Sequence, residues 1–219
     1  MNPLRALVVL IALGVSTSAL AEVEFYAGFG FGNSNADSSP GHILSALSDK
    51  NYDITSVAVD SKDKGWRFLT GLRFSEVWAV ELGYIDLGES STNIVANISP
   101  IDTAQFTQDV ANVLPVMPRG ITLAGVARIS AASMGMQGAT AEDLNIAFKL
   151  GMIDADSERK VNGAFGKDSK DASPFYGVTL GWEFSDFWRG VIGYEVYNMA
   201  DSTEYWSAGV EFKLPDALH

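Results

Sequence analysis

The stretch GWRFLTGLRFSEVWAVELGYIDL, residues 65 to 87, decides the fold of this chain. Apolar side chains occupy every second position on both sides of the short segment 75 to 77. A period of two is typical of a β-strand with one apolar face. Two such runs joined by a three-residue turn predict a β-hairpin made of residues 65–74 and 78–87.

The same alternation recurs along the rest of the chain, with a second tight turn at residues 185–187. The further strands that it predicts are residues 22–32, 121–130, 144–153, 175–184, 188–197 and 204–214. With the first hairpin these make eight strands of about ten residues, the length that a tilted strand needs to cross a membrane. The sequence therefore predicts an all-β fold, an eight-stranded antiparallel up-and-down transmembrane β-barrel spanning residues 22–219.

The apolar face of these strands carries the aromatic residues. All five Trp lie in the apolar phase and near strand ends, where the aromatic girdles of membrane barrels sit. The predicted girdle consists of Trp66, Trp78, Tyr84, Tyr176, Trp182, Trp188, Tyr194 and Trp206. This arrangement favours a barrel whose apolar face meets lipid over a soluble sheet with one solvated face, which would not need strands this long.

The opposite face is rich in Gly and collects the charges of the strands. Six cationic and five anionic groups nearly balance, as a narrow closed lumen requires, because unpaired buried ions are costly. The predicted luminal ion-pair residues are Glu24, Arg67, Arg73, Glu81, Arg128, Lys149, Glu183, Arg189, Glu195, Glu211 and Lys213. The groups most central to their strands are Glu81, Lys149, Arg67 and Arg128. These four could form a switchable ion-pair plug or could simply neutralise the interior, and we favour neutralisation.

Composition excludes several function classes. The chain has 15 Lys and Arg against 27 Asp and Glu, so it lacks the clustered positive surface that nucleic-acid binding needs. There is no Cys, which excludes disulfides, thiolate metal sites and a Cys nucleophile. We therefore predict no cofactor, no metal site and no nucleic-acid partner.

Residues 1–21 have the pattern of a targeting segment. Arg5 precedes an apolar run from Ala6 to Val15, and the segment ends in Ala19, Leu20 and Ala21. This is the pattern of a secretory signal peptide with an A-x-A cleavage site, and the run is too short to span a bilayer. We predict that the signal peptide is cleaved after residue 21 and that the chain is exported.

Several pieces of the sequence resemble the OmpA-like transmembrane domain of the porin-like outer-membrane β-barrel family. They are KGWRFLTGLRFSEVWAVELGYIDLG at residues 64–88, FKLG at 148–151, SPFYGV at 173–178 with the FSD turn at 184–186, and GVEFKL at 209–214. The likeness covers most of the chain after residue 21 and is weakest in residues 89–143. It implies an outer-membrane location, termini and short turns on the periplasmic side, and longer external loops.

In that topology the external loops are residues 33–64, 88–120, 154–173 and 199–203. Within the second loop, Ser99 and Pro100 followed by Phe106, Val110 and Val113 predict a short capped amphipathic helix. Its apolar stripe could contact lipid or a partner, but we expect it to pack on the protein. The charged run at residues 60–64 in the first loop could bind divalent ions or bridge to lipopolysaccharide, but we expect a solvated loop because Lys alternates with Asp.

Function in such a barrel depends on its loops, and these match no known motif. We predict a structural or surface-interaction protein with a charge-paired, plugged lumen and no catalysis. The alternative is a narrow channel for small or hydrophobic solutes. A third reading, a lipid A-modifying enzyme, depends on His42 near Asp37, Ser38 and Ser39. The expected partners are outer-membrane lipid, lipopolysaccharide and the barrel-assembly machinery, and we expect a monomer.

Overall fold

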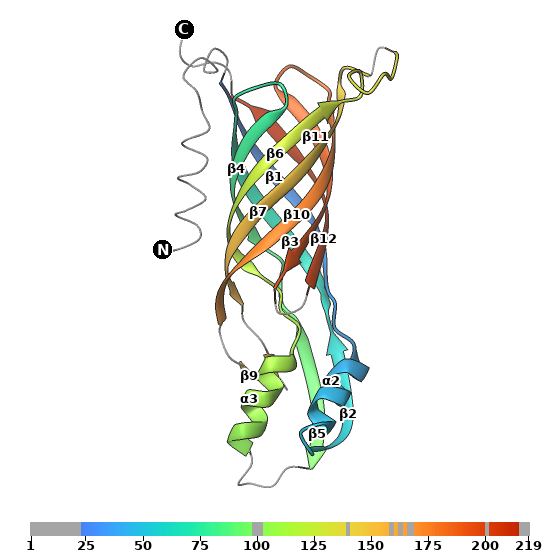
Figure 1. Ribbon diagram of the computed structural model, residues 1–219, viewed down its shortest axis with the longest axis vertical. Helices are drawn as coiled ribbons and strands as arrows, with labels where there is room; N and C mark the ends of the chain where they lie inside the picture. Colours follow the sequence, from blue (N-terminus) through green and yellow to red (C-terminus); the bar gives the residue numbers. More distant parts are fainter. Residues whose placement is uncertain are drawn as a thin grey trace.

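A computed structural model describes residues 23–97, 103–138, 141–157, 160–161, 164–165, 169–199 and 202–214 (Figure 1). The predicted signal peptide, residues 1–21, lies outside the described residues. Among the described residues, no helix has both the length and the apolar character to cross a membrane.

Eight long strands close into a barrel, and this confirms the predicted fold. Around the barrel each strand pairs with its neighbours in the order β1, β12, β11, β10, β7, β6, β4, β3, and β3 pairs with β1 to close it. All of these pairings are antiparallel. The barrel strands are β1 (Glu24–Ala36), β3 (Lys62–Arg73), β4 (Trp78–Asp86), β6 (Arg119–Ser130), β7 (Leu144–Ser157), β10 (Ser169–Glu183), β11 (Trp188–Asn198) and β12 (Ser202–Lys213).

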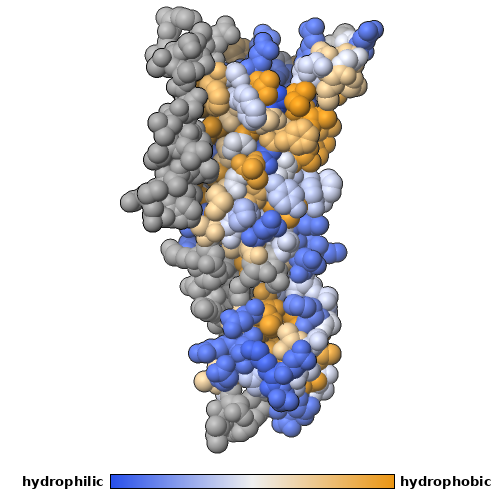
Figure 2. Space-filling model, in the orientation of Figure 1, coloured by the Kyte–Doolittle hydropathy of each residue, from blue (hydrophilic) through white to orange (hydrophobic). Residues whose placement is uncertain are grey.

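Burial alternates along the strands in the predicted phase. On β1, Phe25 and Phe29 are about half exposed, whereas Tyr26 between them is 2% exposed. In a single-layer barrel the exposed phase is the outer wall and the buried phase faces the lumen. Figure 2 shows the result: apolar side chains gather on the barrel wall, and hydrophilic ones dominate the part of the molecule beyond it.

The barrel strands run further than the alternation predicted. β1 continues to Ala36 and β3 starts at Lys62, so their pairing extends beyond Gly32. The extended part reads NSNA on β1 and is polar in both phases up to its last residue. Apolar residues at every second position are required only where a strand faces lipid. Where the paired strands continue into water, the alternation is absent and the sequence does not mark them as strands. The predicted loop 33–64 is therefore wrong at both ends, and the run 60–64 lies largely in β3 rather than in a loop.

The predicted loops also contain a folded unit, which we call the cap module. It consists of helices α2 (Pro40–Ser48) and α3 (Thr103–Val113) and a separate sheet in the order β2 (Asp53–Asp60), β5 (Ser91–Asn97), β8 (Lys160–Val161), β9 (Ala164–Phe165). Figure 1 shows the module beyond one end of the barrel. The prediction of loops at residues 33–64, 88–120 and 154–173 is thus corrected: beside the helix predicted in the second of them, they hold helix α2 and a second sheet.

The cap module has its own hydrophobic core. Ile43 and Leu47 of α2, Ile94 of β5 and Val110 of α3 are 6% exposed or less and pack together. Phe106 and Val113 lie partly buried against the same cluster. The predicted amphipathic helix is therefore confirmed at residues 103–113 and packs on the protein, while its proposed cap at residues 99 and 100 lies outside the described residues.

The closed ladder predicts heat-modifiable migration on gels. Every barrel strand is paired on both sides, so detergent finds no free sheet edge at which to begin unfolding. We expect unboiled protein in dodecyl sulfate to migrate faster than boiled protein. Identical mobility before and after boiling would contradict the closed barrel.

Candidate functional site

The barrel lumen brings together the charged residues that the sequence placed on one face. All eleven lie on the luminal side of the wall, and each takes part in at least one ion pair. The pairs form three layers from mid-barrel toward the end that holds the turns at 75–77 and 185–187. We call this end the turn end and the opposite one the cap end.

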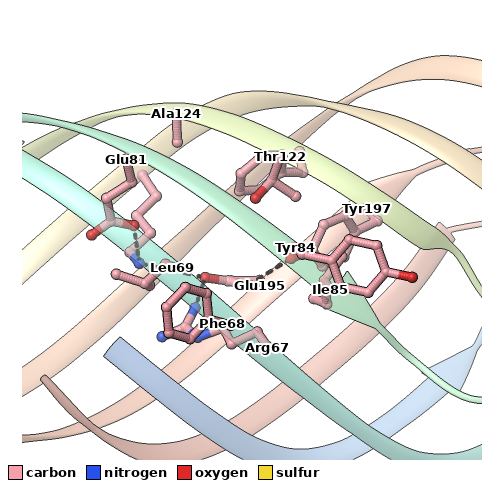
Figure 3. A pocket seen from close by; sticks show the side chains of 12 residues that line it. Arg67, Phe68, Leu69, Glu81, Tyr84, Ile85, Thr122, Ala124, Glu195 and Tyr197 are labelled. Atoms are coloured by element: carbon pink, nitrogen blue, oxygen red, sulfur yellow. Dashed lines mark hydrogen bonds and ion pairs between the residues drawn. The ribbon is translucent and has the colours of Figure 1, made fainter. Parts of the chain in front are cut away.

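The first layer lies at mid-barrel and links β3, β4, β7 and β11 (Figure 3). Lys149 Nζ lies 2.5 Å from Glu81 Oε2 and 3.8 Å from Glu195 Oε1, and the Arg67 guanidinium also pairs with Glu195. All four side chains are at most 7% exposed. Two positive and two negative groups thus neutralise one another away from water.

Two tyrosines complete the hydrogen bonding of this layer. The Tyr26 hydroxyl donates to Glu81 Oε1 at 2.9 Å, and the Tyr197 hydroxyl donates to Glu195 Oε2 at 2.7 Å. Tyr26 fits only because residue 71 on the neighbouring strand is glycine: a Cβ there would lie 2.0 Å from the tyrosine ring. The glycine-rich phase therefore provides the room that the large luminal side chains occupy.

Little free space remains among these side chains. The cavity lined by Arg67, Glu81, Lys149, Glu195 and their neighbours has a volume of about 20 Å³. A cavity of this size holds roughly one water molecule. The space that these side chains leave free between them is therefore small.

Two further layers follow toward the turn end. In the second, Glu211 accepts from Arg189 at 2.6 Å and from Arg128 at 3.5 Å, and Arg189 also donates to Asn145. In the third, Lys213 lies 2.7 Å from Glu183, and Arg73 lies 3.3 Å from Glu24. The third layer is the most exposed, with side chains 17% to 29% accessible. Its ion pairs consequently face water at the turn end.

A wider vestibule opens at the turn end. Its volume is about 340 Å³, and its walls include Arg73, Arg128, Glu142, Asn145 and Glu183. At the second layer, the Arg128 guanidinium lies over the Tyr26 ring, 5.6 Å from the ring centroid. The lumen thus holds a wide, charged space at the turn end and a much smaller one among the side chains of the first layer.

A different kind of contact is found at the cap end. Residues 114–118, which follow α3, are buried, and Met117 packs with Leu87, Ile153 and Tyr205 inside the barrel mouth. The Thr203 hydroxyl donates to the Val116 carbonyl at 2.6 Å. This mouth segment was not predicted from the sequence, although its apolar composition, LPVMP, is unusual for a predicted loop.

The predicted girdle residues lie on the outer wall in two groups. Trp78, Trp182 and Trp188 are near the turn end, and the last of these packs on Phe212 at 4.9 Å between ring centroids. Nearer the cap end, Trp66 packs on Tyr84 at 5.5 Å and Trp206 on Tyr194 at 4.6 Å. Tyr176 is also exposed on the wall, at 50%.

A polar cluster ties the two halves of the cap module together. Asp109 of α3 is 5% exposed and accepts from Lys50 Nζ at 2.5 Å, from the Tyr52 hydroxyl at 2.7 Å and from Gln105 at 3.2 Å. Hydrogen bonds from Lys50 and then Tyr52 hold the pKa of Asp109 below its ordinary value. The cluster joins the segment after α2 to α3, 59 residues apart.

The low pKa of Asp109 predicts that acid loosens the cap module. Because the folded-state pKa is depressed, the stabilisation is complete above the ordinary Asp value of about 3.9 and is lost as the pH falls through the folded value. We expect spin labels at S45C and N112C, exposed on α2 and α3, to report one narrow distance at pH 7 and a broadened one below about pH 4. In D109N the broadening should already be present at pH 7, and a narrow distance there would contradict this role.

His42 lies in the first turn of α2, with its side chain exposed. Ser39, which the enzyme reading needed as a neighbour, is the N-cap of this helix, and its Oγ accepts from the His42 backbone N–H at 3.2 Å. The Ser39 hydroxyl oxygen thus has a capping role that favours helix formation. The proximity of His42 and Ser39 in sequence is therefore explained by a helix start.

A closed eight-stranded barrel with an apolar wall, aromatic girdles and a charged lumen defines a transmembrane β-barrel protein. The chain belongs to the family described as "Outer membrane protein beta-barrel domain", whose model matches residues 6–213. Membership of this family locates the protein in the outer membrane.

Solved structures of similar fold include outer-membrane barrels from three bacterial sources. Neisserial surface protein A is 14% identical over 88% of this chain and 99% of its own, with a TM-score of 0.46. Ail, the attachment invasion locus protein of Yersinia pestis, is 13% identical over 88% and 99%, with a TM-score of 0.47. The N-terminal β-barrel domain of Pseudomonas aeruginosa OprF is 9% identical over 87% and 97%, with a TM-score of 0.49. No curated protein matches the chain.

Proposed function

We propose that this protein is a non-conducting, non-catalytic barrel that carries the cap module on the outside of the outer membrane for contact with other surfaces. The observation that carries the proposal is the combination of a mid-barrel cavity of about 20 Å³ with a separately folded module at one end. Side chains that fill the lumen favour a role for the barrel as a support rather than as a pore.

The composition of the module supports an interaction role. The module buries its own apolar residues, among them Ile43, Leu47 and Val110, in one core. Its folding therefore does not depend on a partner. The exposed face of β2 and β5 includes Thr55, Ala58 and Val95, the last of them 58% exposed. A rigid element of this kind positions contact residues more exactly than a flexible loop would.

Labelling of single cysteines on intact cells tests the orientation that this function needs. The chain has no Cys, so S45C on α2 and D186C in the turn at the opposite end provide a matched pair of exposed sites. We expect a membrane-impermeant maleimide to label S45C on intact cells and D186C only after the outer membrane is permeabilised. The reverse pattern would place the module in the periplasm and overturn the proposal.

A narrow channel is the second candidate, and the vestibule of about 340 Å³ at the turn end favours it. A channel would use this vestibule as an entrance and would require the first ion-pair layer to rearrange. In a swelling assay, liposomes containing the protein would then swell in small sugars or amino acids. Liposomes that behave like protein-free ones support the closed barrel.

A further inference from the structure

The second ion-pair layer of the lumen carries one positive charge in excess. Among the residues that the structure describes, its charged members are Arg128, Arg189 and Glu211, whereas the first and third layers each hold two cations and two anions. All three side chains are at most 7% exposed. An uncompensated charge buried to this degree is costly, so the layer is expected to attract an anion.

The excess charge belongs to Arg128. Glu211 Oε2 accepts from Arg189 at 2.6 Å but from Arg128 only at 3.5 Å, and Arg189 also donates to Asn145. A guanidinium has five N–H donors, and the long bond to Glu211 is the only hydrogen bond of the Arg128 side chain within the described part of the chain. The Nε atoms of both arginines are buried without a partner. The Tyr26 ring stabilises the Arg128 cation without cancelling its charge.

Arg128 borders the vestibule at the turn end. This space of about 340 Å³ falls within the size range of small-molecule pockets. Asn145, which is 3% exposed, lines the same space. Guanidinium groups bind carboxylates through short, charge-assisted hydrogen bonds, often two at once. The inner part of the vestibule therefore fits a carboxylate.

The rim of the vestibule carries the opposite charge. Of the five charged residues that line the space, Arg73 and Glu183 are engaged in the ion pairs of the third layer. Glu76 and Glu142 are exposed, and neither forms an ion pair with any residue that the structure describes. Two unpaired carboxylates oppose the entry of a simple anion and attract a cationic group. The vestibule therefore suits a ligand that carries one charge of each sign.

We propose that the vestibule binds a small zwitterion, either an amino acid or a short peptide. Its carboxylate pairs with Arg128 and accepts from the Asn145 amide, and its ammonium group faces Glu142 and Glu76 at the rim. Binding neutralises the second layer. In the expected topology the turn end faces the periplasm, so the ligand comes from the periplasmic solution. This activity goes beyond the supporting role proposed for the barrel, because it requires neither the cap module nor a conducting lumen.

Amide chemical shifts of the protein in lipid nanodiscs, followed by NMR during titration with alanylalanine, test the proposal. We expect saturable shifts confined to residues around the vestibule, at 73–77, 128–133 and 142–145. R128Q should bind about ten-fold more weakly, because it removes a charged hydrogen-bond donor. E142Q should bind about three-fold more weakly, since its charge is exposed. K64Q removes one positive charge from an exposed site outside the vestibule and should leave the affinity unchanged.

Two blocked dipeptides test each charge of the ligand on the unchanged protein. The C-terminal amide of alanylalanine lacks the carboxylate and should bind about ten-fold more weakly than the parent dipeptide. N-acetylalanylalanine lacks the ammonium group and should bind about three-fold more weakly, a difference that should vanish in the E76Q/E142Q double variant.

Heat-modifiable migration of each variant shows whether its barrel is intact. R128Q should remain folded, because Glu211 keeps Arg189 as its partner. Undiminished affinity of R128Q, equal affinity for the C-terminal amide, or the absence of saturable shifts would overturn the site. N-acetylalanylalanine that binds as tightly as the parent dipeptide would overturn the assignment of the ligand as a zwitterion.

Discussion

Replacing Glu81 with glutamine is expected to lower the free energy of unfolding of the barrel by about 3 to 5 kcal/mol, the cost of breaking a buried ion pair from one side. Lys149 would lose its partner at 2.5 Å and keep only Glu195 at 3.8 Å. The substitution preserves side-chain volume, so the effect reports charge. Urea titration of the folded barrel in lipid vesicles, followed by tryptophan fluorescence, measures it.

Two variants control this result. Glu76 lies exposed in the turn 75–77, and E76Q should change the free energy of unfolding by less than about 0.5 kcal/mol. The double variant E81Q/K149M removes both charges and should recover part of the loss, because no unpaired ion is then left at this pair. An E81Q effect no larger than that of E76Q would contradict the buried ion-pair layer.

Arginine at Leu82 is expected to destabilise the barrel by about 2 to 4 kcal/mol, the cost of a lipid-facing cation near the midplane. Leu82 is next to luminal Glu81 and is 54% exposed on the outer wall. The same urea titration in vesicles measures the effect. It should shrink in vesicles of thinner bilayers, because the side chain can then reach the headgroups more easily.

Leu44 provides the matched control for this substitution. It is 40% exposed on α2 of the cap module, outside the membrane-spanning wall. L44R should therefore cost less than about 0.5 kcal/mol, since its charge remains in water. If L82R were as mild as L44R, the assignment of the outer face to lipid would be inverted.

The sequence was sufficient to predict the barrel because lipid and lumen impose opposite requirements on alternate residues. Phe25, Tyr26 and Phe29 illustrate this: neighbours point to different environments, and the apolar set is continuous only where lipid is present. The charged residues obey the same alternation, so Glu81 and Lys149 could be assigned to the lumen from their positions in the alternation alone. Their pairing could not, because the register that joins β4 to β7 through β6 is a property of the closed barrel.

The cap module could be predicted from the sequence only in part. Local signals for α2 were present, since Ser39 and Pro40 are typical of a helix start and Ile43 and Leu47 lie four residues apart. What the sequence could not reveal is that two separate loops share one core. Lys50 and Asp109 meet across 59 residues, and no local pattern encodes such a contact.

Single-channel recording of the wild-type protein in a planar bilayer tests the central claim most directly. A lumen filled at the Glu81 layer predicts a silent wild type, with at most brief openings in E81Q, where the layer is weakened. Steady wild-type conductance whose ion selectivity changes in E81Q would contradict the account, because ions would then be crossing the layer that we propose is closed.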